Sequence, residues 1–231
     1  MQLPVCFIYL KDIDSTIIQS VRYASQNNFV GEEIRSYKYI RNHSNSSRSN
    51  GIKEVQNHMQ TGGYSLVVYD GYRSQTAVNH FIEWAQTSDE SQKHLYYPTI
   101  DKKAVFPPGY VSKKSGYSRG STVDFSIIKL NEKLYDVEIT ERRLSDGSKI
   151  QFLDDGTIDM GSSFDLLHPA SHYDSQLIQP EYLLMRNFLK KVMEDHGFRR
   201  YDKEWWHYTL EDEPYPDTYF DFPIEENNQD L

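Results

Sequence analysis

The chain has 231 residues and a formal net charge of −9. Residues 211–231 hold eight acidic side chains and no Lys or Arg, which leaves −1 for the other 210 residues. Without a basic stripe to follow a phosphate backbone, nucleic acid is excluded as a partner. The single cysteine, Cys6, excludes an internal disulfide and a zinc finger built on several cysteines.

The N-terminal apolar stretch is short. Residues 1–10 read MQLPVCFIYL and are followed at once by Lys11 and Asp12. This pattern has neither the basic start nor the length of a signal peptide or a membrane span. We therefore expect a cytoplasmic protein without a membrane partner, although a periplasmic chain whose leader had been removed would look the same.

The first half of the chain alternates loops with regular elements. The polar stretch 42–51 (NHSNSSRSNG) predicts a loop. Apolar residues at helical spacing then predict a helix that ends at the glycine pair 62–63. The apolar run 65–69 predicts a buried strand, and residues 74–86 place their apolar side chains on one helical face.

The second half supplies two more strands and one more helix. Residues 122–128 (TVDFSII) alternate between apolar and polar side chains, as a strand does. Residues 181–195 predict a helix with Leu184 and Leu189 on its apolar face, and 205–210 predict an aromatic strand. Because strands and helices do not alternate regularly, the pattern predicts an α+β fold with a small antiparallel sheet.

The length suits a single domain over residues 1–231, with a disordered tail at 225–231. The acidic, aromatic segment before that tail has two interpretations. It can be an exposed arm that binds another protein, or it can pack back on the domain. We expect it to pack back through its aromatic side chains: Tyr215, Tyr219, Phe220 and Phe222.

The stretch KEWWHYTL (203–210) places Glu204 and His207 three residues apart beside two tryptophans. In a regular strand these two side chains would point to opposite faces. For both to reach one site, the strand must begin after Glu204, or a bulge must intervene. We expect Glu204 just before the strand and His207 within it.

Together with Asp124, this pair suggests a metal-assisted hydrolase. Zinc takes nitrogen and oxygen ligands and activates a water, while a nearby carboxylate takes the proton. Asp124 and His207 could be ligands and Glu204 the base. Each residue also has an ordinary alternative: the histidine as a core residue, the aspartate as a solvated one, and Arg73 as a turn cap.

Four motifs then occur in order: DGYR (70–73), SGYSRGSTVD (115–124), GSSFD (161–165) and EWWHY (204–208). They resemble the D-alanyl-D-alanine dipeptidases, the VanX-type branch of the LAS family of zinc peptidases. The resemblance extends over about residues 6–224. It implies the LAS/Hedgehog-type fold, in which helices flank a small antiparallel sheet.

The resemblance also implies roles for individual residues. Asp124 and His207 fall on zinc ligands, Glu204 on the catalytic base, and Arg73 on the arginine that stabilises the developing oxyanion. Asp165 matches a residue that holds the substrate's ammonium group. Three further positions match residues near the substrate or behind the arginine: Ser115, Tyr23 and Asp70.

The implied activity is that of a metallo-dipeptidase, a hydrolase that cleaves the small D,D-dipeptide D-Ala-D-Ala into two D-alanines with one zinc ion as cofactor. Such an enzyme could serve glycopeptide resistance or the recycling of cell-wall D-alanine. The residues do not separate these two roles.

One position departs from the family pattern. Where the family has its first zinc-ligand histidine, seven residues before Asp124, this chain has Tyr117. Tyr117 could ligate the metal as a phenolate and favour a harder cation than zinc. It could instead turn aside and leave zinc with two protein ligands. Alternatively, the site could be empty, in a metal-impaired homologue that binds D,D-dipeptides or peptidoglycan fragments without cleaving them. Two histidines after Asp165, His168 and His172, are candidates to replace the missing ligand.

Overall fold

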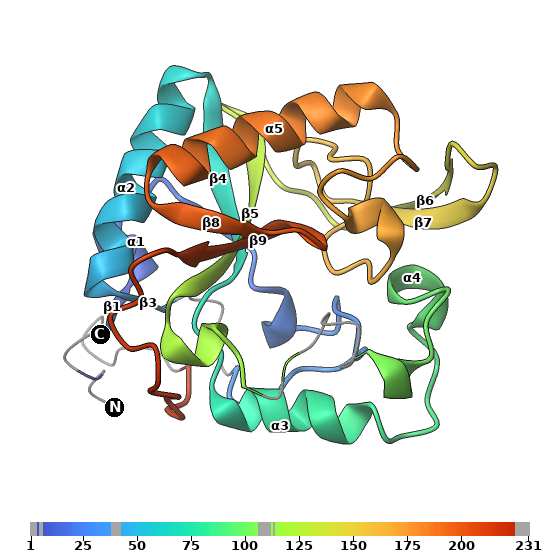
Figure 1. Ribbon diagram of the computed structural model, residues 1–231, viewed down its shortest axis with the longest axis horizontal. Helices are drawn as coiled ribbons and strands as arrows, with labels where there is room; N and C mark the ends of the chain where they lie inside the picture. The colour runs from blue at the N-terminus through green and yellow to red at the C-terminus, as the bar shows by residue number, and fades with distance from the viewer. Residues whose placement is uncertain (1–3, 5–6, 38–42, 106–111, 113, 225–231) are drawn as a thin grey trace.

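A five-stranded sheet forms the centre of the protein (Figure 1). The computed structural model describes residues 4, 7–37, 43–105, 112 and 114–224. In spatial order the strands are β2 (Ile18–Gln19), β4 (Tyr64–Asp70), β5 (Thr122–Lys129), β9 (Glu204–Leu210) and β8 (Phe198–Tyr201). All neighbouring pairs are antiparallel except β2 with β4, which run parallel. The predicted α+β fold with a small antiparallel sheet is therefore confirmed, with one short parallel strand added at its edge.

Helices cover both faces of this sheet. Helix α2 (Ser46–Thr61) and helix α5 (Pro180–Asp195) pack together on one face, and α3 (Gln75–Trp84) lies on the other side (Figure 1). Alternate side chains of β5, starting with Val123, enter the core under α2 and α5. The alternation predicted for 122–128 is thus confirmed, but the second face of β5 is buried as well.

Short elements complete the chain. They are β1 (Phe7–Tyr9), α1 (Leu10–Ile13), the 3-10 helix η1 (Arg22–Ala24), β3 (His43–Asn45), α4 (Lys93–Tyr96), η2 (Lys102–Ala104), η3 (Tyr117–Arg119), β6 (Glu138–Arg143), β7 (Lys149–Asp154) and η4 (Pro169–Ser171). Strand β1 pairs with β3, and β6 with β7 forms a separate hairpin. Within the described ranges, no helix combines the length and the apolar character that crossing a membrane requires.

The loop predicted for residues 42–51 was wrong. Strand β3 forms there by pairing with β1, and α2 already begins at Ser46. Serine and asparagine are as common at helix starts as in loops, so the composition alone did not separate the two.

The buried face of α5 also differs from the prediction. Leu184 is 69% exposed, whereas Arg186 is fully buried beside Leu189. The sequence prediction put Leu184 on the buried face and left Arg186 on the surface, because arginine side chains are seldom fully buried.

The segment after β9 packs back on the domain, as expected for its phenylalanines. Phe222 stacks on Tyr72 at 4.1 Å between ring centroids, and Phe7 contacts both Phe220 and Phe222. The backbone N–H of Phe220 donates to the carbonyl oxygen of Ser118, inside η3. The predicted disordered tail, 225–231, lies outside the described residues.

Candidate active site

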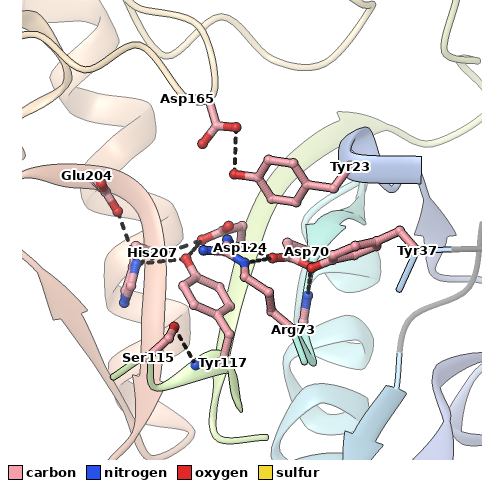
Figure 2. A network of polar contacts seen from close by, with 11 residues as sticks. Tyr23, Tyr37, Asp70, Arg73, Ser115, Tyr117, Asp124, Asp165, Glu204 and His207 are labelled. Atoms are coloured by element: carbon pink, nitrogen blue, oxygen red, sulfur yellow. Dashed lines mark hydrogen bonds and ion pairs between the residues drawn. The ribbon is translucent and has the colours of Figure 1, made fainter. Parts of the chain in front are cut away.

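A pocket of about 380 Å³ opens where β5 and β9 meet the loops around η3 and before α3. Figure 2 shows the polar side chains that converge there. Seven of the nine predicted site residues line it: Tyr23, Arg73, Ser115, Tyr117, Asp165, Glu204 and His207. The other two, Asp70 and Asp124, are buried directly behind them.

Three of these residues form a row across the sheet. In the strand register, Asp70 of β4 pairs with Asp124 of β5, and Asp124 pairs with His207 of β9. Paired residues in adjacent strands point to the same face. Strand pairing alone therefore brings together side chains that lie 137 residues apart in sequence.

An irregularity in β9 brings Glu204 to the same side as His207. Glu204 pairs with Tyr201 and Tyr208 pairs with Arg200, so three residues of β9 have no counterpart on β8. Such a bulge changes the direction in which side chains point. Glu204 Oε2 consequently lies 3.1 Å from His207 Nδ1. Glu204 is the first residue of the strand rather than the residue before it, and the bulge is the device that unites the pair.

The turn that carries Tyr117 is held against β5 by close contacts. A Cβ atom at Gly116 would lie 2.2 Å from Thr122 Oγ1, so only glycine allows the turn to approach so closely. Ser115 Oγ accepts a hydrogen bond from the backbone N–H of Tyr117 (3.2 Å). The turn thus fixes the backbone from which the Tyr117 side chain projects, and that residue is 5% exposed.

The Tyr117 hydroxyl lies between the two predicted zinc ligands (Figure 2). It donates a hydrogen bond to Asp124 Oδ1 at 2.5 Å and lies 2.8 Å from His207 Nδ1. In this structure the Tyr117 side chain points between the two residues rather than away from them. Burial, and in second place the negative charge of Asp124, raises the pKa of Tyr117 well above that of a free tyrosine.

Arg73 is fixed on all sides. Its Nε and Nη2 atoms donate to Asp70 Oδ2 at 2.9 and 2.7 Å. Its guanidinium carbon lies 4.0 Å from the ring centroid of Tyr117, and the ring centroids of Tyr23 and Phe81 are farther away, at 4.9 and 5.0 Å. Burial favours the neutral form of Arg73, but Asp70 and the surrounding tyrosines together outweigh it, so the pKa of Arg73 is raised. The result is a permanent, oriented cation at the pocket wall.

Sequence reasoning missed Tyr37, the residue behind this pair. Its hydroxyl donates to Asp70 Oδ1 at 2.8 Å, and Asp70 is fully buried. The chain contains 18 tyrosines, and no motif set this one apart.

We expect Tyr37→Phe to lower the free energy of unfolding by about 1–3 kcal/mol, because it leaves a buried carboxylate short of a donor. Urea unfolding measures the change. Tyr97→Phe is a matched control, since the Tyr97 hydroxyl is buried without a hydrogen-bond partner among the described residues. Equal effects of the two substitutions would contradict a role for Tyr37 in holding Asp70.

At the far side of the pocket, Asp165 faces Tyr23. The Tyr23 hydroxyl donates to Asp165 Oδ2 at 2.8 Å. Asp165 has a φ of +61°, which a non-glycine residue adopts only when its surroundings hold it there. Burial raises the pKa of Asp165 to about 7. Burial, and then the charge of Asp70, likewise raises the pKa of Asp124.

The two histidines considered as replacements do not line this pocket. His168 Nδ1 instead accepts a hydrogen bond from the backbone N–H of Ala170 and caps η4. In the described part of the chain, no three His, Cys, Asp or Glu side chains come together to hold a metal ion. The phenol oxygen of Tyr117 is a polar atom that contacts both Asp124 and His207.

Two cations that sequence reasoning did not single out also line the pocket. Arg119 is paired with Glu213 at 2.6 and 2.9 Å, so its charge is matched by the C-terminal segment. Lys114 lies exposed beside Ser115, with its ammonium 5.5 Å from the ring of Tyr219. Their place just before and within the SGYSRGSTVD motif was the available signal.

Comparison with known proteins agrees with the motifs. The sequence profile of a family described as D-ala-D-ala dipeptidase matches residues 6–139 and 139–225. A D-alanyl-D-alanine dipeptidase of Enterococcus faecalis is 35% identical over 94% of this chain and 98% of its own length. One from Streptomyces coelicolor is 34% identical with the same coverage, and one from Escherichia coli is 25% identical over 82% of this chain and 77% of its own length.

Proposed function

Because this chain belongs to the D-ala-D-ala dipeptidase family of peptidases, we propose that it hydrolyses D-alanyl-D-alanine to two D-alanines with the help of zinc. The observation that carries the proposal is the convergence of Glu204, His207, Asp124 and Arg73 at one pocket. A base, a fixed cation and metal-type ligands are the groups that hydrolysis of an amide requires.

The charges around the pocket suit a dipeptide with free ends. Asp165, supported by Tyr23, offers a carboxylate to the ammonium group. In Figure 2, Ser115 and Asp165 lie on opposite sides of the Tyr117 hydroxyl. Lys114, beside Ser115, offers a positive charge to the carboxylate of the dipeptide. A zwitterion of two small residues fits both the polarity and the volume of about 380 Å³.

The donor atoms present suit a cation. Asp124 Oδ1 and His207 Nδ1 are 4.0 Å apart. Two ligands of a tetrahedral zinc ion lie about 3.3 Å apart, so the two side chains would have to approach each other slightly to share one ion. The Tyr117 hydroxyl lies between these two atoms. It would have to move aside to admit the ion, and from there its oxygen would serve as the third ligand. Zinc held by these three residues would lower the pKa of a water and polarise the scissile carbonyl.

The chain's own residues would carry the remaining steps. Glu204 takes a proton from the attacking water and returns it to the leaving amine. Arg73, held by Asp70, faces the carbonyl oxygen and stabilises the negative charge that develops there. Asp165 fixes the amino end, so that the scissile bond lies between Glu204 and Arg73.

The direct test is D-alanine release from D-Ala-D-Ala by the purified full chain over a zinc titration, with L-Ala-L-Ala as the control substrate. We expect zinc-dependent release from the D,D-dipeptide alone. If no D-alanine appears at saturating zinc, the proposal of a zinc dipeptidase is wrong.

A second candidate function is favoured by one observation. The Tyr117 hydroxyl already satisfies Asp124 and His207 by hydrogen bonds, so the pocket is complete without a further ligand. The chain would then bind D,D-dipeptides or peptidoglycan fragments without efficient cleavage. Calorimetric binding of D-Ala-D-Ala to the chelator-treated chain, together with the absence of D-alanine release at any zinc concentration, would establish this alternative.

The pH dependence of substrate affinity follows from Asp165. Its carboxyl, with a pKa of about 7, is neutral below that pH and charged above it. Because the charged form attracts the ammonium group, we expect KM to rise as the pH falls below 7, by about tenfold per pH unit. The pH profile of KM measures this, and Asp165→Asn should flatten the profile while raising KM at high pH. An unchanged profile in Asp165→Asn would show that another group binds the ammonium end.

A further inference from the structure

Arg186 is a buried cation whose hydrogen bonds to the described residues all go to uncharged groups. It lies on α5 with no exposed surface, and the carboxylate nearest in effect, Asp159, acts on it only at a distance. The guanidinium donates to the carbonyl oxygens of Met160 (2.7 Å), Ala170 (2.9 Å) and His172 (2.7 Å) and to Ser162 Oγ (3.2 Å). This charge is costly to bury, since burial lowers its pKa to about 9.

The four acceptors flank the residue that lines the pocket. Met160 and Ser162 precede Asp165 by a few residues, and Ala170 and His172 follow it at a similar distance. Arg186 therefore ties the two ends of the loop together, with Asp165 at its middle. One planar group with five donors can do this, whereas no apolar side chain can.

The same network reaches the strand that carries Glu204. Ser162 Oγ, which accepts from Arg186, also accepts from Trp205 Nε1 at 3.1 Å. Trp205 follows Glu204 directly in β9. The loop with Asp165 and the strand with Glu204 are thus anchored to one buried guanidinium.

The need for such an anchor follows from the backbone at Asp165. Its φ of +61° persists only if the surrounding contacts hold it. A methionine of similar length in place of Arg186 would remove the cost of burying a charge. It would also remove the hydrogen bonds that join the two ends of the loop. The free energy lost by burying the Arg186 charge is explained if the loop must hold Asp165 in one position.

We propose that Arg186 is a positioning residue for the ammonium subsite: it holds the Asp165 loop at the distance from Glu204 at which a dipeptide with a free amino group is preferred. The proposal rests on the proposed function, because it assigns the origin of that site's selectivity. Arg186 touches no substrate and acts only through the loop.

The experiment compares D-Ala-D-Ala with N-acetyl-D-Ala-D-Ala in the zinc-loaded full chain. We expect Arg186→Met to raise KM for D-Ala-D-Ala about tenfold, with kcat changed less than about threefold, and to reduce the preference over the acetylated compound by the same factor. Arg186→Lys, which keeps a cation with fewer donors, should recover part of the preference. In an Asp165→Asn background, Arg186→Met should have no further effect on it.

Leu189→Ala serves as the matched control, since Leu189 is buried on the same helix. It should lower the melting temperature without changing the preference between the two compounds. If both Arg186 variants keep the wild-type preference and only melt earlier, as Leu189→Ala does, Arg186 is a stabilising residue and the inference is overturned.

The two proposals fail in different ways. If the wild-type chain releases no D-alanine, the proposed hydrolysis is wrong, and the same comparison is made on calorimetric dissociation constants. A wild-type preference that Arg186→Met abolishes would then still support the positioning role. A wild-type chain that does not discriminate between the two compounds overturns it.

Discussion

Tyr117→His is expected to raise the zinc affinity of the chain by at least about 100-fold. Loss of a residue that only hydrogen-bonds to a metal ligand costs up to about 100-fold, and gain of a ligand itself should have at least that effect. The reason is reach. A phenol oxygen extends about one zinc–nitrogen bond, about 2 Å, further from the backbone than an imidazole nitrogen does. The Tyr117 hydroxyl at 2.5 Å from Asp124 Oδ1 and 2.8 Å from His207 Nδ1 therefore stands in the space that a histidine would leave for the ion.

Zinc titrations in the presence of a competing chelator measure this change. Tyr117→Phe is the control, because it removes the hydroxyl without adding a ligand, and its affinity should remain far below that of Tyr117→His. Equal affinities of the wild-type chain and Tyr117→His would show that the phenol oxygen is already a full ligand. If Tyr117→His binds zinc tightly and still releases no D-alanine, the dipeptidase proposal itself fails.

Glu204→Gln should lower kcat for D-Ala-D-Ala by about 10²- to 10⁴-fold, the range that a positioned general base contributes. Glutamine keeps the size of the side chain and one oxygen for the contact with His207 Nδ1, now 3.1 Å. It cannot take a proton from water. Because the defect lies in the chemical step, the dissociation constant of the dipeptide should change little.

Steady-state D-alanine release and calorimetric binding separate these two effects. Glu211→Gln is a suitable control: it makes the same substitution just beyond the other end of β9, on an exposed side chain, and should leave both quantities unchanged. Comparable kcat values for Glu204→Gln and the wild-type chain would assign the base to another residue.

The helices and strands that follow from short-range patterns were predictable from the sequence. The strand at 65–69, the helix at 74–86 and the alternating strand at 122–128 each follow from a short-range pattern, and each was found. The site residues in them came together because strand register is fixed by the same alternation.

What escaped prediction depends on contacts between distant segments. Tyr37 acquires its role only by meeting Asp70, and Arg186 is buried only because the loop around Asp165 supplies its acceptors. Neither partner is visible in the local sequence. The hydroxyl position of Tyr117 likewise required the paired strands, since Asp124 and His207 are 83 residues apart.

The order of the strands has a consequence for how the protein matures on the ribosome. Strand β9 is the last of the described strands in sequence, yet it occupies an inner place in the sheet, between β5 and β8. Until residues 204–210 have left the exit tunnel, the edge of β5 has no partner and neither Glu204 nor His207 can face Asp124. Long-range pairing of this kind is slow. The pocket is thus completed only after β9 emerges, and a chain that stops before β9 carries an open sheet edge for chaperones or proteases to engage.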